Sequence, residues 1–430
     1  MIIAAFDSTT DPLTGSIYPN MCDKNYINNV NKRPSNFDSH MFRSTLANNS
    51  YKTHVLLPYK NVQYFPLNEI NSNYLYIVNT FNTDFFYEMR DIGFSYVDDR
   101  ILKDANSSKC KIIFIQDVEG MSGIIGTHHE FDFKTIQDWC VNSNINPNAV
   151  HYICGNLISN VRAKEQGCKY NVHPVTIQET WNNILGYPPN ITKFEPTTSK
   201  YLYLNYNRQS RFHRICMLSK LKQQNLFNKG LNSFNTMGRS FNEFGYRLEN
   251  FELGLSIYGK ELFDNAPIFI DQDNSNITSS VGDLSNYQNT FLSLISETLT
   301  EPGTLFCSEK TWRSIIVGHP FMILGSTNTL LYLQSEGFKT FNAWVDESYD
   351  QYTELDKKIN IILSNLKRFS QMSVEELKKI RQEMEPTLIY NKNYMLEYCK
   401  KKYYYKDVYS HKKPVELILE EIWNNLIKGN

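Results

Sequence analysis

Short apolar runs that alternate with helical patterns constrain the fold of this chain more than any other feature. Each run ends close to Pro, Asn, Asp or Gly, which is typical of strands leaving a buried sheet. In the first half the strand-like runs are His54–Leu57, Tyr74–Val78, Lys111–Ile115 and Val150–Cys154, and the helical patterns are Phe133–Val141 and Val175–Leu185. Such alternation predicts α/β layers around a parallel sheet.

The alternation restarts after a proline-rich interruption. Residues 186–200, GYPPNITKFEPTTSK, contain three prolines among small polar residues, which indicates a linker. Beyond it we expect strands at Tyr201–Asn205, Pro267–Ile270, Phe291–Ile295 and Phe321–Leu324, and helices at Arg211–Asn225, Glu309–Val317 and Thr329–Glu336. The C-terminal part predicts further helices at Ile359–Arg368, Val374–Met384, Tyr394–Lys402 and Val415–Ile427.

These patterns predict two Rossmann-like domains and a helical tail. We expect the first domain over residues 1–190, the second over 200–370, and the tail, packed across both, over 371–430. Ligands of such proteins bind between domains or at the carboxyl ends of parallel strands. Both expectations point to the loops after Ile115, Leu204, Ile295 and Leu324.

The composition agrees with a folded chain and argues against several classes of protein. Of the 430 residues 41% are hydrophobic, and the net charge of −1 gives no overall attraction to nucleic acid. The eight cysteines include no C-x-x-C pair, so nothing indicates a zinc site or a disulfide framework. No run approaches the roughly 18 apolar residues that cross a bilayer. Without a span or a recognisable signal peptide, we expect a cytoplasmic location, in the host cytoplasm if the protein is viral.

A basic loop follows the first strand of the second domain. The segment Leu204–Arg214, LNYNRQSRFHR, places Arg208, Arg211 and Arg214 where a helix begins. The free N–H groups and the positive dipole end of a helix N-terminus attract an anion. Arginine can bind a phosphate through paired donors. The segment therefore predicts a phosphate site, the alternative being a solvated basic turn.

A second polar segment surrounds the next two strands. Glu297 follows a strand, Ser308 has the pattern of a helix N-cap, and Glu309 and Lys310 fall in the first helical turn. Glu309 suits the positive end of the helix dipole, whereas Lys310 does not, so a lysine there indicates a phosphate ligand. The alternative is an ordinary capped helix of an α/β domain.

The second domain resembles a known family over roughly residues 200–349. The order strand, Ser-Glu, loop, Ser-Glu-Lys, helix, Gly-x-Pro, strand, Gly looks like the donor-binding half of GT-B type glycosyltransferases. It is closest in style to the fucosyltransferase-like (family ten) enzymes, which have Thr where this chain has Ser308. The resemblance implies two Rossmann-like domains facing a central cleft, an acceptor domain first and a nucleotide-sugar domain second. It implies that Glu309 binds the donor ribose and Lys310 the pyrophosphate, with Arg208 or Arg211 as a second phosphate contact. We expect Arg214 and Glu297 to belong to the same donor-binding site.

The first domain offers carboxylates for acid–base chemistry. In the segment from Lys111 to Gly123, KIIFIQDVEGMSG, a strand is followed by Asp117 and Glu119. Fucosyltransferase-like enzymes have a proposed general base in a comparable loop, so Glu119 is the first candidate and Asp117 the second. His128 and His129 are further candidates, and a loop carboxylate that caps the next helix is the alternative.

Two other patterns are weaker. Asp271-Gln272-Asp273 is a D-x-D triplet of the kind that chelates metal, although such triplets are frequent by chance at strand ends. The segment Lys401–Lys413 mixes Lys with Tyr, which suits nucleic acid but is more often a solvated helix end. We expect neither a metal site nor a nucleic-acid site here.

These patterns together favour an inverting, metal-independent glycosyltransferase. It would need a nucleotide-sugar as substrate and no cofactor, and it would transfer the sugar to a hydroxyl of a glycan or of hydroxymethylated viral DNA. A retaining reaction could use the same donor site. The alternative is a non-catalytic protein that binds nucleic acid or a phosphorylated ligand, which the basic loop favours and the nearly neutral charge opposes.

Overall fold

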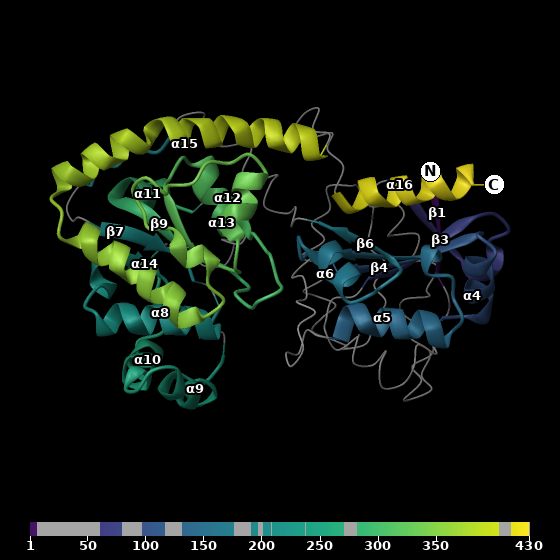
Figure 1. Ribbon diagram of the computed structural model, residues 1–430, viewed down its shortest axis with the longest axis horizontal. Coiled ribbons are helices and arrows are strands. Elements are labelled where there is room, and N and C mark those ends of the chain that lie inside the picture. Colours follow the sequence, from purple (N-terminus) through teal and green to yellow (C-terminus); the bar gives the residue numbers. More distant parts are fainter. Residues whose placement is uncertain are drawn as a thin grey trace. The chain divides into compact units, whose positions relative to one another are not determined.

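The computed structural model describes residues 1–6, 61–79, 97–116, 131–175, 191–196, 201–207, 209–236, 238–270, 282–403 and 414–429. The chain divides into two compact units (Figure 1). Unit 1 comprises Met1–Glu179 and Tyr409–Asn430, and unit 2 comprises Thr180–Val408. Each unit is a parallel sheet with helices, which confirms the predicted α/β class. Within the C-terminal segment, residues up to Val408 belong to unit 2, and residues from Tyr409 onward belong to unit 1.

In the described part of unit 1, six parallel strands form one sheet in the order β2-β1-β3-β4-β5-β6. Their bounds are β1 Ile2–Phe6, β2 Val62–Pro66, β3 Tyr74–Asn79, β4 Cys110–Gln116, β5 Val150–Cys154 and β6 Asn171–Pro174. The central strands β3, β4 and β5 were predicted because their apolar runs are continuous. Strands β1, β2 and β6 were not predicted. The runs His54–Leu57 and, beyond its first residue, Val175–Leu185 lie outside the described residues.

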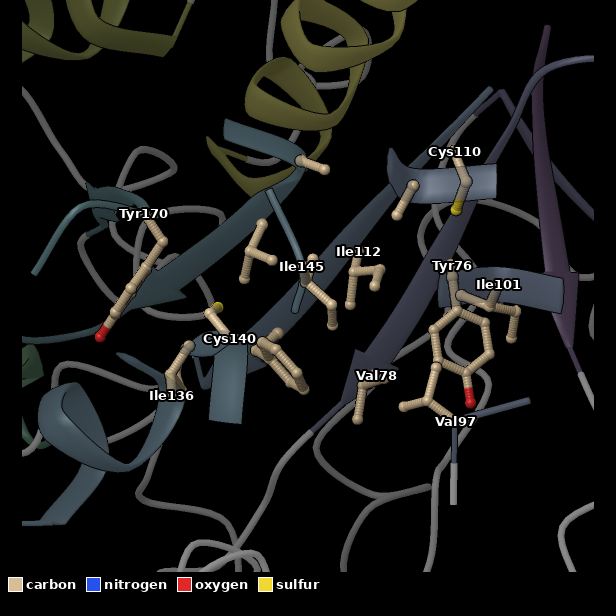
Figure 2. Packing of buried hydrophobic residues seen from close by; sticks show 14 of the residues in the cluster. Tyr76, Val78, Val97, Ile101, Cys110, Ile112, Ile136, Cys140, Ile145 and Tyr170 are labelled. Carbon is tan, nitrogen blue, oxygen red and sulfur yellow. The ribbon is translucent and has the colours of Figure 1, made fainter. Parts of the chain in front are cut away.

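Helices cover both faces of this sheet. On one face the helices are α4 Asp99–Asn106, α5 Phe131–Asn142 and α6 Ser159–Glu165, with 3-10 turns at Leu67–Glu69 and Pro147–Ala149. Figure 2 shows Val78 and Ile112 of the sheet packing with Ile136 and Cys140 of α5. The opposite face is covered by α16, Pro414–Lys428, which comes from the far end of the chain. Unit 1 is therefore complete only with its C-terminal helix.

In the described part of unit 2, four parallel strands form a sheet in the order β10-β9-β7-β8. The strands are β7 Tyr201–Asn205, β8 Gly230–Asn232, β9 Thr290–Ser296 and β10 Phe321–Leu324. The helices are α8 Phe212–Gln223, α9 Gly245–Phe251, α10 Leu255–Asp264, α11 Leu284–Asn289, α12 Glu309–Ile316, α13 Thr329–Ser335, α14 Leu355–Ser370 and α15 Val374–Tyr403. Short 3-10 turns span Phe227–Lys229, Phe241–Glu243 and Ser348–Gln351.

Two predictions for unit 2 were wrong. Pro267–Ile270 is not a strand, because only Ile268 forms an antiparallel bridge, with Phe234, and Phe269 is exposed rather than buried between layers. The two helices expected around Val374–Met384 and Tyr394–Lys402 are one helix, α15, which continues through Pro386. Its buried residues on both sides of the proline keep it against unit 2, including Tyr398, whose ring stacks on Trp312.

The strand order locates a ligand-binding edge in unit 2. From β7 the chain crosses to β8 on one side, and it later returns to β9 on the other side of β7. The carboxyl ends of β7 and β9 therefore lie at a topological switch point, where open α/β sheets bind their ligands. The sheet of unit 1 has the same reversal between β1 and β3, one strand away from β4, which precedes Asp117 and Glu119.

Candidate functional site

The first turn of α8 is attached to the end of β9. Arg211 is the N-cap of α8, and its Nη1 donates to the carbonyl oxygen of Thr298 at 3.2 Å. His213 Nε2 and Arg214 Nη2 both donate to the carbonyl oxygen of Glu297, at 2.8 and 3.1 Å. The polar loop after β7 thus places two arginines at the switch point.

The carboxylate of Glu297 holds the start of α12. It accepts hydrogen bonds from the backbone N–H of Ser308 at 3.0 and 3.1 Å, from Thr311 Oγ1 at 2.6 Å and from the N–H of Thr298 at 3.2 Å. The side chain is fully buried.

The first turn of α12 carries Glu309 and Lys310, and the structure pairs them with each other. Ser308 is the N-cap, and its Oγ accepts from the N–H of Lys310 at 3.3 Å. Lys310 Nζ lies 2.7 Å from Glu309 Oε1, and the side chains are 12% and 22% exposed. The helix buries Thr311, Trp312 and Arg313, so its polar start is presented at the edge of the sheet.

Burial and neighbouring charges both shift the pKa values of these groups. Burial raises the pKa of Glu309, but Lys310 and Arg313 outweigh it and bring the pKa down to about 2. Burial lowers the pKa of Lys310, and Arg214 lowers it further, so Glu309 does not fully compensate. Burial and Arg214 also lower the pKa of His213 well below its usual value. The neighbouring cations stabilise the charged form of Glu309, and Arg214 adds to the effect of burial in disfavouring the charged forms of Lys310 and His213. A bound anion would stabilise the charged forms of these two bases.

A small pocket adjoins the ion pair on the sheet side. It is lined by Leu204, Tyr206, Tyr287, Ser293, Leu294, Ile295, Lys310, Arg313 and Ser314. The ring centroids of Tyr206 and Tyr287 are 6.3 Å apart, and Tyr206 OH accepts from Asn286 Nδ2 at 3.1 Å. The sequence did not single out Tyr206, Tyr287 or Arg313. Two of the three could have been indicated by the sequence, because Tyr206 follows β7 directly and Arg313 lies one helical turn after Glu309.

The structure brings together the predicted donor residues that it describes. They come from two distant segments and share one strand end: Arg211, Arg214, Glu297, Glu309 and Lys310. The remaining candidates lie outside the described residues: Arg208, Asp117, Glu119, His128, His129, the triplet Asp271-Gln272-Asp273 and most of the Lys/Tyr segment. All of these site assignments remain predictions.

The described residues show neither a metal-binding cluster nor a helix that could cross a membrane. Within the described ranges, no three His, Cys, Asp or Glu side chains lie close enough together to hold a metal ion. Among the helices of the same ranges, none combines the length and the apolar character that a membrane crossing requires.

Comparisons with known proteins give little further information. No protein-family model matches the chain, and no curated protein matches it. Among solved structures the chain is similar to "T4 phage BGT in complex with UDP and Mn2+", with 12% sequence identity, a TM-score of 0.33 and 99% coverage of both chains. The residues of the site, and not this likeness, support the function proposed below.

Proposed function

We propose that this chain is a glycosyltransferase of the GT-B type whose unit 2 binds a nucleotide-sugar donor. The observation that carries the proposal is the cationic cluster at the switch point between β7 and β9, where Arg211, Arg214 and Lys310 meet. Sugar transfer from such a donor expels a nucleoside diphosphate, and preorganised cations stabilise the charge that develops on it. An anion-binding edge in an α/β unit meets this requirement.

Each described residue has a proposed role in donor binding. Lys310 and Arg211 contact the diphosphate. Arg214 is almost fully buried, so it contributes positive charge to the site without contacting the ligand. Glu309 accepts hydrogen bonds from the ribose hydroxyls. Its pKa of about 2 supports this role, because the carboxylate then remains ionised at neutral pH. Arg208 is a further proposed phosphate contact.

The proposed reaction is a single displacement with inversion. The acceptor oxygen attacks the anomeric carbon while the bond from that carbon to the phosphate oxygen breaks. The hydroxyl proton passes to a carboxylate of unit 1, Glu119 or Asp117, and the nucleoside diphosphate leaves with the electron pair. The cations neutralise the leaving group, so the reaction would need neither a metal nor a cofactor. We propose a cytoplasmic enzyme acting on a glycan or on hydroxymethylated viral DNA.

The same cluster would also serve a protein that binds a phosphorylated ligand without chemistry. All of its described residues lie in unit 2, and nothing in anion binding requires a base. This alternative predicts nucleotide binding without turnover of the sugar donor, so binding and transfer must be measured separately.

The direct test is the affinity for nucleoside diphosphates. We would titrate the purified chain with UDP, GDP, ADP and TDP, and continue with the tightest ligand. Lys310→Ala and Arg211→Ala should each weaken binding by roughly 1.5–3 kcal/mol, the cost of losing a charged hydrogen bond. Lys357→Ala is the control, because Lys357 is an exposed lysine of the same unit that pairs with Glu354. Unchanged affinity in both cluster variants would place the donor site elsewhere.

A further inference from the structure

Glu297 holds two helices with two different parts of the same residue. Its backbone carbonyl oxygen accepts from His213 and Arg214 in the first turn of α8. Its carboxylate accepts from the N–H of Ser308 and from Thr311 Oγ1 at the start of α12. Arg214 and Lys310, which belong to helices distant in the chain, are therefore held in place through one residue.

The residue is itself firmly held in the sheet. Its N–H donates to the carbonyl oxygen of Leu324 at the end of β10, at 2.9 Å. Its side chain is 0% exposed. The hydrogen bonds from Ser308, Thr311 and Thr298 occupy the acceptor positions of the carboxylate, which in an ionised state number about four. A ligand would have to displace these donors to reach it.

We propose that Glu297 is a positioning residue, which does not touch the nucleotide-sugar but holds Arg214 and Lys310 together so that both act on its diphosphate. This inference rests on the proposed function, and it replaces the expected donor contact of Glu297 by an indirect role. Arg214 and Lys310 are both positively charged and repel each other, and the carboxylate of Glu297 offsets part of that repulsion. Fixing the cations before the ligand arrives removes an ordering cost from binding.

Thr311 allows this role to be tested without altering any charge. Thr311 is fully buried, and its hydroxyl donates to Glu297, so Thr311→Val can affect the ligand only through the protein. We expect Thr311→Val to weaken binding of the tightest nucleoside diphosphate about threefold to fivefold, because the lost hydrogen bond is to Glu297 and only part of its free energy is transmitted to the ligand. Thr311→Ser keeps the hydroxyl and should retain affinity within about twofold.

Thr290→Val is the matched control. Thr290 is equally buried, at the opposite end of β9, and its hydroxyl donates to the carbonyl oxygen of Asn286 at 2.7 Å. It should lower the melting temperature while leaving the dissociation constant unchanged. If Thr311→Val behaves in the same way, Glu297 serves only the fold, and the proposal is overturned.

Double variants distinguish an indirect role from a direct contact. Glu297→Gln replaces one acceptor oxygen by an amide that faces N–H donors, and it should weaken binding about tenfold. If Glu297 acts through Lys310, adding Lys310→Ala to Glu297→Gln should weaken binding by less than Lys310→Ala does in the wild type. Fully additive losses would indicate a direct contact and overturn the inference. Should Glu297→Gln not fold, the same cycle is run with Thr311→Val.

The outcomes also separate this inference from the proposed function. Loss of affinity in Lys310→Ala without any effect of Glu297→Gln or Thr311→Val overturns the positioning role alone. A wild-type chain that binds none of UDP, GDP, ADP and TDP overturns both.

Discussion

Glu309 and Lys310 are neighbours in the chain, yet their charge states depend on residues beyond the pair. Arg313, one turn along α12, helps to lower the pKa of Glu309, and Arg214 of α8 lowers the pKa of Lys310. Of these two arginines, only Arg214 was expected to belong to the site, because it lies in the basic loop. Nothing in the sequence indicated that Arg214 and Lys310 would meet, because that proximity follows from the strand order.

The pKa of Glu309 leads to a prediction about acid stability. Its pKa falls from 4.5 to about 2 on folding, so its contribution to stability is present above the unfolded value and is lost as the pH falls towards 2. At pH 7 Glu309→Gln should lower the free energy of unfolding, by at most about 3 kcal/mol and by less because Lys310 is itself disfavoured as a cation. The difference should shrink below about pH 4.5. Urea unfolding of both proteins at several pH values measures it, and a difference that does not vary with pH would contradict the assignment.

Single elements of this chain show what periodicity can and cannot reveal. The apolar spacing of Val415–Ile427 predicts an amphipathic helix, and α16 confirms it. The pattern does not say which surface the helix covers. In the structure Leu419 and Ile422 of α16 pack on the sheet of unit 1, with Leu75 and Ile113 in the same cluster.

The packing of α16 leads to a prediction about unit 1. Leu419 is fully buried, so Leu419→Ala should lower the free energy of unfolding by about 2–5 kcal/mol, through lost burial and the cavity that remains. Ile427 of the same helix is 46% exposed, and Ile427→Ala should change stability by less than about 1 kcal/mol. Thermal unfolding followed by circular dichroism compares the two. Equal effects would mean that α16 does not cover this core.

At the scale of the whole molecule, the two units have separate sheets and separate proposed tasks. The described residues of the proposed donor site all belong to unit 2, whereas the candidate bases Glu119 and Asp117 belong to unit 1. The chain reaches unit 1 again only at its C-terminus. If transfer needs both units, binding and catalysis should respond to different substitutions.

The loop after β4 provides that test. Glu119→Gln keeps the size of the side chain but cannot take up a proton, so transfer should fall by roughly 100-fold or more. The affinity for the nucleoside diphosphate should stay within about twofold, because the proposed contacts lie in unit 2. Release of nucleoside diphosphate from the sugar donor, with glycan or hydroxymethylated DNA as acceptor, measures transfer. Asp117→Asn and His128→Gln are assayed in parallel, and full activity in all three would remove this loop from the mechanism.

The amino-acid sequence was enough to predict the fold class and the two polar segments of the candidate site. Continuous apolar runs between helical patterns are typical of the buried strands of parallel α/β layers, which is why β3, β4, β5, β7, β9 and β10 were predicted. The short strand β8 was not predicted, because Gly230–Asn232 has no apolar run. Its position in the sheet is set by pairing with β7. Tertiary structure alone decided that β7 and β9 are neighbours, that Glu297 attaches both helix starts, and that α16 belongs to unit 1. The physical reason is that local periodicity fixes which face of an element is buried, whereas its partner depends on contacts between residues far apart in the chain.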